Sequence, residues 1–205
     1  YFCTTSSYVK STLCFATADN IEGPYTYVDT ILYSGYGKSN ISETNLYDVL
    51  GKNADISRYL EYGGYNNKEW PNCIDPAIFT DADGRMWMNY GSWSGGIFLL
   101  EIDPTTGYPI YPVDDKDADP YYGYRLIGGG HHSAEGPYIQ YDAENGYYYL
   151  FASINNCCDG ERSRYKVVVG RSQDLLGPYL DKSGKDMINN AWELVLEGDG
   201  QKFFG

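Results

Sequence analysis

The sequence predicts an all-β protein with the architecture of a β-propeller, and three observations support this prediction. The composition is rich in Tyr (23 residues) and Gly (24 residues), which favours aromatic strands joined by tight turns. A hairpin pattern at residues 75–92 returns at residues 135–153, where a short apolar strand, an Asp-rich turn ending in Gly and an aromatic strand ending in Ser follow one another. Regular repeats of one such unit indicate propellers or other repeat arrays.

Ten strands are expected where β-branched and aromatic residues form runs bounded by Gly, Pro, Asn or Asp. In chain order they span residues 1–6, 11–18, 25–33, 76–80, 86–91, 96–102, 138–141, 147–153, 165–171 and 192–197. The last of them is expected to begin a further sheet. Because the chain begins inside one strand and stops soon after another, we expect it to be part of a longer propeller.

Two polar segments, residues 35–71 and 109–124, are too long for ordinary hairpin loops, and loops of this length are often functional. A helical turn is expected at residues 57–62. The sequence Asp-Ala-Asp-Gly at residues 81–84 is similar to the start of a calcium loop. It lacks the later ligands of such a loop, including the Glu at position 12, so we expect a hairpin turn.

Two carboxylates, Asp75 and Glu135, open the two copies of the repeated hairpin. The first strand of each propeller blade lines the central channel, so the two acids are expected to meet near one axis. Paired carboxylates beside a polar channel are typical of glycoside hydrolysis. Glu22 also precedes a Gly-Pro-Tyr turn, but it aligns with Leu176 in the matching turn and is therefore expected at the surface.

Other side chains near these acids are open to two interpretations. The chain's only histidines, His131 and His132, follow a run of three glycines and precede Glu135, where they either contact a substrate or make structural hydrogen bonds. Trp93 lies between serines on a turn, where it either stacks on a sugar face or is a buried turn aromatic.

The charge balance excludes several partners. The formal net charge is −13, which opposes binding to nucleic acid and to anionic membranes and fits a neutral ligand such as a sugar, although acidity also serves solubility alone. No apolar run approaches the ~20 residues of a membrane helix.

The five cysteines give no clear framework. Cys157 and Cys158 are adjacent, so a bond between them would be strained, whereas Cys3 and Cys14 fall on neighbouring strands and are placed to meet. Their spacing does not match a zinc site, and no metal ligands are predicted.

Taken together, several motifs resemble glycoside hydrolase family 43, in particular its arabinanase branch. They lie at residues 70–76, 90–97, 132–139, 157–160 and 165–172. The resemblance implies a five-bladed propeller that cleaves α-1,5-linked arabinan with inversion. It assigns Glu135 as the general acid and Asp75 as the residue that raises the pKa of this acid and orients it. It also implies substrate contacts for Asn72, Ser92, Trp93 and His132.

Two functional residues of the family have no match in this chain. The family's general base is an Asp at the start of the first blade, and its central metal or water site uses a His of the last blade; neither has a counterpart here. Residues 1–205 are therefore expected to form part of one catalytic domain, with the end of blade two, blades three and four and the start of blade five. Such a piece is expected to be inactive alone.

The resemblance implies a secreted, periplasmic or cell-surface protein whose partner is plant cell-wall arabinan or arabino-oligosaccharides. No cofactor is expected within this chain, while a central calcium or other metal ion is compatible with the full-length protein. Two alternatives stay open: an exo-acting α-L-arabinofuranosidase or β-xylosidase on the same fold, and a noncatalytic sugar-binding propeller.

Overall fold

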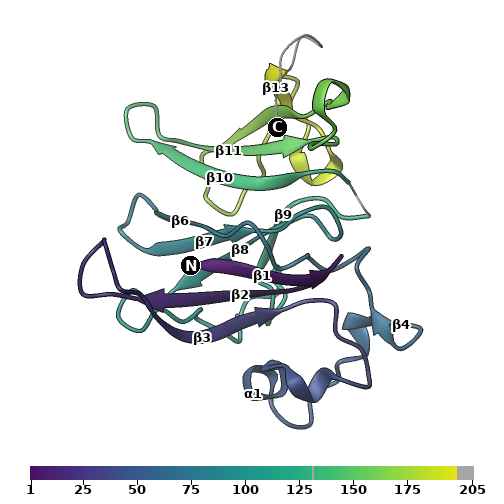
Figure 1. The fold of residues 1–205 in the computed structure, drawn as a ribbon. Coiled ribbons are helices and arrows are strands. Elements are labelled where there is room, and N and C mark those ends of the chain that lie inside the picture. The colour runs from purple at the N-terminus through teal and green to yellow at the C-terminus, as the bar shows by residue number, and fades with distance from the viewer. Residues whose placement is uncertain (131, 198–205) are drawn as a thin grey trace.

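Three antiparallel sheets follow one another along the chain and lie as successive layers (Figure 1). The computed structural model describes residues 1–130 and 132–197. The first sheet contains β1 (Phe2–Ser7), β2 (Lys10–Thr17) and β3 (Thr26–Tyr33). The second contains β6 (Ala77–Thr80), β7 (Met86–Tyr90), β8 (Ile97–Ile102) and β9 (Tyr124–Ile127). The third contains β10 (Glu135–Asp142), β11 (Tyr147–Ile154), β12 (Lys166–Ser172) and β13 (Glu193–Glu197).

Within each sheet, the strands pair in chain order. The predicted all-β fold with four-stranded antiparallel blades is thus confirmed, and the strand boundaries agree within a few residues. Short elements lie in the long segment after β3. They are the 3₁₀ helices Ile41–Glu43 and Ser57–Tyr59, the helix α1 (Leu46–Leu50), and the small hairpin of β4 (Leu60–Glu61) and β5 (Gly64–Tyr65). Two further 3₁₀ helices span Gly160–Arg162 and Met187–Asn189.

Two strand predictions are wrong. Residues 192–197 do not begin a further sheet, because β13 pairs with β12 as the fourth strand of the third sheet. The four-residue strand β9 is absent from the predicted strands, and the predicted loop ends at its first residue, yet it pairs with β8 and completes the second sheet. Local composition indicates a strand but not its partner, and a strand this short carries little signal. The prediction that residues 192–197 are the start of blade five is therefore wrong as well.

The cysteine prediction for β1 and β2 is also wrong. The register places Cys3 opposite Leu13 and Cys14 opposite Phe2, so the two cysteines are offset by one residue. Side chains alternate between the faces of a strand, and accordingly Cys3 is exposed whereas Cys14 is buried. Both thiols are free.

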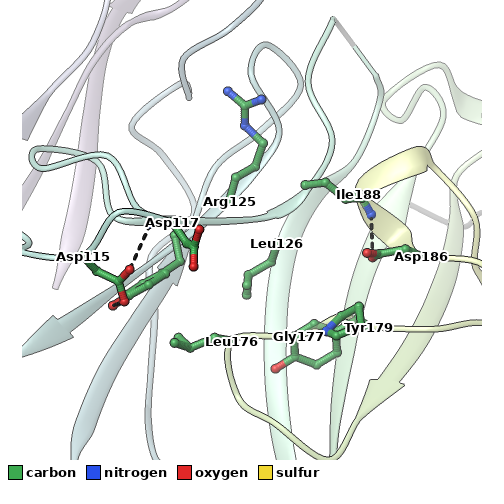
Figure 2. Close-up of a pocket in the computed structure, with 11 residues that line it drawn as sticks. Asp115, Asp117, Arg125, Leu126, Leu176, Gly177, Tyr179, Asp186 and Ile188 are labelled. Atoms are coloured by element: carbon green, nitrogen blue, oxygen red, sulfur yellow. Dashed lines mark hydrogen bonds between the residues drawn. The ribbon is translucent and has the colours of Figure 1, made fainter.

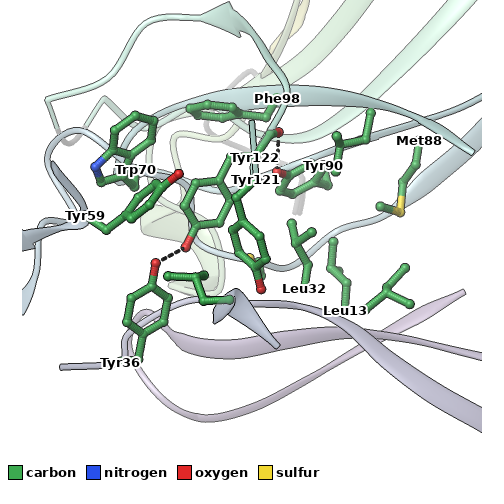
Figure 3. Packing of buried hydrophobic residues seen from close by; sticks show 14 of the residues in the cluster. Leu13, Leu32, Tyr36, Tyr59, Trp70, Met88, Tyr90, Phe98, Tyr121 and Tyr122 are labelled. Atoms are coloured by element: carbon green, nitrogen blue, oxygen red, sulfur yellow. Dashed lines mark hydrogen bonds between the residues drawn. The ribbon is translucent and has the colours of Figure 1, made fainter. Parts of the chain in front are cut away.

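Both long segments pack into the space beside the first and second sheets. Tyr59, Tyr121 and Tyr122, which come from these segments, are fully buried. Figure 3 shows that their rings cluster with Trp70. The ring centroids of Trp70 and Tyr122 are 5.7 Å apart. Tyr122 donates a hydrogen bond to the carbonyl of Tyr33 at 2.8 Å, so that its polar end is satisfied inside an aromatic core. The two segments therefore contribute side chains to the hydrophobic core, and this packing positions the residues that precede Asp75.

A second apolar cluster joins the second and third sheets. It includes Trp87 of β7, Ile97 of β8, Ile139 of β10 and Leu150 of β11, all nearly or fully buried. Each of these side chains points to the neighbouring sheet, and burial of such side chains contributes about 1.5–3 kcal/mol each. This packing fixes the start of β10 against the second sheet.

The turn between β6 and β7 is the predicted hairpin turn. Gly84 adopts a φ of 84°, which favours glycine. The buried carboxylate of Asp81 accepts hydrogen bonds from the backbone N–H groups of Asp83 and Arg85 and from the indole N–H of Trp87 at 2.8 Å. The Arg85 guanidinium adds an ion pair at 2.9 Å. One carboxylate thus organises the whole turn.

We expect Asp81→Asn to lower the free energy of unfolding by about 1–3 kcal/mol at pH 7, because the buried donors lose a charged acceptor. Burial raises the pKa of Asp81, but the hydrogen bonds and the Arg85 charge outweigh it and hold the pKa below its ordinary value. A lowered pKa stabilises the fold above the ordinary carboxyl range near pH 4, and this contribution is lost as the pH falls through the folded-state pKa.

Urea unfolding at pH 7 and near pH 3 checks this. The difference between wild type and Asp81→Asn should shrink at the acidic pH, while Asp83→Asn, a change at an exposed carboxylate in the same turn, should matter little at either. A difference that grows on acidification would contradict the assignment.

Candidate active site

Asp75 and Glu135 come from neighbouring sheets and lie side by side. Asp75 lies two residues before β6, and Glu135 is the first residue of β10. The backbone N–H of Gly136 donates a hydrogen bond to Oδ2 of Asp75 at 3.2 Å. Asp75 has a φ of 56°, which is uncommon for a residue other than glycine and turns its side chain toward β10. The two acids that the hairpin repeat singled out are thereby brought together.

The environment of Asp75 alters its ionisation. Burial raises the pKa of Asp75, the Gly136 N–H lowers it, and the negative charge of Glu135 raises it further, so that the net direction is upward. Two half-buried carboxylates with like charge oppose each other's ionisation. The pair therefore has the electrostatic arrangement that acid–base chemistry uses.

Both carboxylate oxygens of Glu135 are held by hydroxyl groups. Ser92 Oγ donates to Oε2 at 2.8 Å, and the Tyr165 hydroxyl donates to Oε1 at 2.8 Å. The backbone reinforces this placement, since Ser92 and Glu135 form an isolated β-bridge and the N–H of Trp93 donates to the carbonyl of Ala134 at 2.8 Å. The orientation of Glu135 is thus fixed from two sides.

Sequence reasoning missed Tyr165 as a site residue and took it for the first residue of a strand. In the structure it directly precedes β12 and reaches Glu135 from the far end of a loop. Its motif resembled the family, but the pattern around it is that of an ordinary strand. Only the pairing of β11 with β12 brings it beside Glu135.

A pocket of about 480 Å³ opens beside Glu135. Four of the side chains expected at the site line it: Asn72, Ser92, Trp93 and Glu135. Residues 5–8, which are the end of β1 and the start of the turn to β2, form another wall. Trp93 is half-buried and borders the pocket, so one part of its surface stays available to a ligand.

Asn72 is 5 % exposed, and its Oδ1 has no hydrogen-bond partner among the described residues. A buried acceptor without a partner is costly, and such groups are rare in folded proteins. His132 is exposed and does not border the pocket. His131 lies outside the described residues.

Across residues 1–130 and 132–197, no three His, Cys, Asp or Glu side chains gather as a metal site. These residues therefore do not by themselves fit a central ion. In the same ranges no helix has the length and apolar character needed to cross a membrane.

A second pocket, of about 360 Å³, lies between the second and third sheets (Figure 2). Its acids already have partners: Asp186 accepts from the N–H of Ile188 at 3.0 Å, and Asp115 accepts from the N–H of Asp117 at 2.9 Å. Its Tyr179 is nearly fully buried. None of the predicted site residues borders it, so the candidate site is the pocket at Glu135.

Comparisons with known proteins identify relatives of this chain. Residues 49–203 match the model of glycosyl hydrolases family 43. An extracellular endo-α-(1→5)-L-arabinanase of Thermotoga petrophila is 38% identical over 207 aligned residues, which cover 100% of this chain and 39% of that protein. An extracellular endo-α-(1→5)-L-arabinanase 2 of Bacillus subtilis is 36% identical over 195 residues, covering 95% and 34%.

Solved structures show the same likeness. A crystal structure of the Thermotoga petrophila endo-1,5-α-L-arabinanase superposes with a TM-score of 0.73 at 36% identity, covering 96% of this chain and 41% of that one. The chain thus spans between about a third and two fifths of the length of these relatives.

Proposed function

The chain belongs to glycosyl hydrolases family 43, and from this premise we propose that the whole protein is an inverting endo-hydrolase of α-1,5-linked arabinan. The observation that carries the proposal is that Glu135 borders an open pocket while Asp75, from the neighbouring sheet, accepts a hydrogen bond from the residue next to Glu135. The substrate class comes from the relatives, which are named endo-arabinanases. Their names also call them extracellular, which supports secretion or a place at the cell surface.

In this proposal Glu135 is the general acid. It gives its proton to the glycosidic oxygen as the bond to the sugar breaks. The hydroxyl groups of Ser92 and Tyr165 then donate to the carboxylate that forms, and hydrogen bonds to a charged acceptor are stronger than those to a neutral one. They therefore stabilise the transition state more than the ground state.

Asp75 orients and tunes this acid. Its carboxylate is anchored by the N–H of Gly136, the residue next to Glu135, which keeps the two side chains in register. The like charges of the two neighbouring carboxylates oppose each other, and this raises the pKa of Asp75. Asn72, Ser92 and Trp93, which line the pocket, are proposed to contact the substrate, with Trp93 stacking on a sugar face. His132 does not border this pocket, and its proposed contact with the substrate rests on the resemblance to the family alone.

Inversion also needs a carboxylate that activates water on the opposite face of the sugar. Within the described residues, Glu135 is the only acid that borders the pocket. We assign the water-activating carboxylate to a part of the whole protein outside these 205 residues. The 205-residue chain alone is then expected to bind arabino-oligosaccharides weakly and not to hydrolyse them.

The test is incubation of the whole protein with linear α-1,5-arabinan. An endo-acting inverting enzyme gives a rapid fall in viscosity, a ladder of oligosaccharides and products of the opposite anomeric configuration. A single short product released from chain ends would instead indicate an exo-acting enzyme. Binding without new reducing ends would indicate a sugar-binding module and overturn the proposal.

Replacement of Tyr165 by Phe should lower kcat on arabinan about tenfold with little change in KM, because one charge-assisted hydrogen bond to Glu135 is worth about 1.5 kcal/mol or more. Burial raises the pKa of Tyr165, so the hydroxyl stays a donor over the working pH range. Steady-state kinetics of Tyr138→Phe, an exposed tyrosine of β10, provide the control. Equal rates in wild type and Tyr165→Phe would remove Tyr165 from the site.

A further inference from the structure

Two adjacent thiols lie in the loop between β11 and β12. The Sγ atoms of Cys157 and Cys158 are 2.8 Å apart. Cys158 is exposed and Cys157 is half-buried, so reagents in solution reach the pair. The other cysteines differ: Cys14 and Cys73 are buried, and Cys3 is exposed but distant in sequence from any partner thiol. The loop thus presents the only adjacent pair of thiols in the sequence.

This loop is fastened to the candidate active site at both ends. At its start, the N–H of Asn155 donates to Oγ of Ser133 at 2.8 Å, two residues before Glu135. At its end, Tyr165 donates to the Glu135 carboxylate. In between, the N–H of Arg164 donates to the carbonyl of Asn156 at 3.0 Å and closes the loop on itself. A change of backbone geometry at the thiols therefore acts on groups that hold Glu135.

The thiols and the acid are also electrostatically close. The pKa of Cys157 is raised, first by its hydrogen bond with Cys158, then by burial and by the negative charges of Cys158 and Glu135. Because the thiolate is the nucleophile, Cys157 is a slow first attacker, and the exposed Cys158 is the thiol that reacts with an incoming reagent.

We propose that Cys157 and Cys158 form a dithiol modification site that a low-molecular-weight disulfide oxidises to a disulfide within the loop. The thiolate of Cys158 attacks one sulfur of the reagent, forms a mixed disulfide and releases one thiol. Cys157 then loses its proton, attacks Sγ of Cys158 and releases the second thiol. Overall, two protein thiols are oxidised and one reagent disulfide is reduced. The two thiols formed from the reagent are the only products released.

The reaction is expected to be reversible. Cα atoms of adjacent residues are about 3.8 Å apart, which is shorter than the separation that relaxed disulfides span. Strained and exposed disulfides are readily reduced and tend to be the labile or regulatory ones. A dithiol reagent should therefore reopen the bond and restore both thiols.

The effect on hydrolysis rests on the proposed function. Ring closure changes the backbone at Cys157 and Cys158, and the loop passes this change to Tyr165 and Ser133. Small misplacements of a catalytic group cost much of the rate, so the oxidised protein should hydrolyse arabinan several-fold more slowly.

The experiment treats the protein with oxidised glutathione and follows thiol titration and peptide mass. The expected result is loss of two thiols and of two hydrogen atoms from the peptide that holds Cys157 and Cys158. Cys157→Ser should stop at a stable glutathione adduct on Cys158, and Cys3→Ser should react as wild type does. A wild-type protein that keeps its thiols, or that only accumulates glutathione adducts, would overturn the proposal.

Activity is read in the same samples of the whole protein. Oxidation should slow arabinan hydrolysis, dithiothreitol should restore it, and the Cys157→Ser, Cys158→Ser double variant should not respond to either reagent. An inactive but normally oxidised protein would refute the proposed function alone, because the thiol measurement does not depend on hydrolysis. Full activity of the oxidised protein would refute the link between the loop and Glu135.

Discussion

Replacing Glu135 by Gln is expected to lower the rate of arabinan hydrolysis by the whole protein about 10²–10⁴-fold, the usual contribution of a general acid. Ser92 and Tyr165 donate to different oxygens of Glu135. Gln has nearly the same shape, and its single carbonyl oxygen keeps one of these two hydrogen bonds, but it carries no transferable proton. The substrate should therefore still bind, and the loss should fall on kcat. Initial rates on unactivated linear arabinan measure the effect.

Two comparisons separate acid catalysis from a general disturbance. An aryl arabinoside with a good leaving group needs little protonation, so Glu135→Gln should lose much less activity on it. Glu22→Gln, the same change at an exposed glutamate before a Gly-Pro-Tyr turn, should leave both rates unchanged. If Glu135→Gln kept near wild-type activity on arabinan, Glu135 would not be the acid.

Replacing Asp75 by Asn is expected to lower kcat on arabinan about 10²-fold, because the anchor and the charge beside the acid are weakened together. The Asn carbonyl oxygen still accepts from the N–H of Gly136, so the backbone arrangement should survive. What disappears is a negative charge next to Glu135. Because one of two neighbouring like charges is removed, the basic limb of the pH–rate profile should move to lower pH.

A pH–rate profile of wild type and Asp75→Asn measures both effects, and Asp19→Asn, at an exposed turn residue, is the matched control. A profile with unmoved limbs would exclude the electrostatic role of Asp75. A moved basic limb with full kcat would exclude its role in orienting Glu135 and leave the electrostatic one.

The candidate site was partly predictable because its acids stand at fixed places in a repeat. The hairpin that begins at Asp75 and the hairpin that begins at Glu135 share one local pattern. Such a pattern can be recognised from residues that are neighbours in the sequence. Burial of Asn72 and the half-burial of Trp93 depend on segments far along the chain. For this reason the sequence could not decide whether Trp93 stacks on a sugar or is a buried turn aromatic. The answer depends on the distant residues 5–8, which form another wall of the same pocket.

The features that escaped prediction are those decided by pairing over long distances. Tyr165 reaches Glu135 only because β12 pairs with β11, and β13 joins the third sheet only because it finds β12 across a connection of many residues. The offset of Cys3 and Cys14 was missed for a related reason. One residue of register moves a side chain to the opposite face, and composition does not encode register.

The bridge between Ser92 and Glu135 links the second sheet to the third by main-chain contacts, and the bond from Trp93 to Ala134 lies beside it. Separation of the two sheets must break these contacts, so the site cannot open as a frayed edge while the sheets remain joined. Amide hydrogen exchange at Trp93 should then proceed only through the larger unfolding event that also exposes the strands. The free energy that keeps the candidate site intact would then equal the free energy that keeps the second and third sheets together.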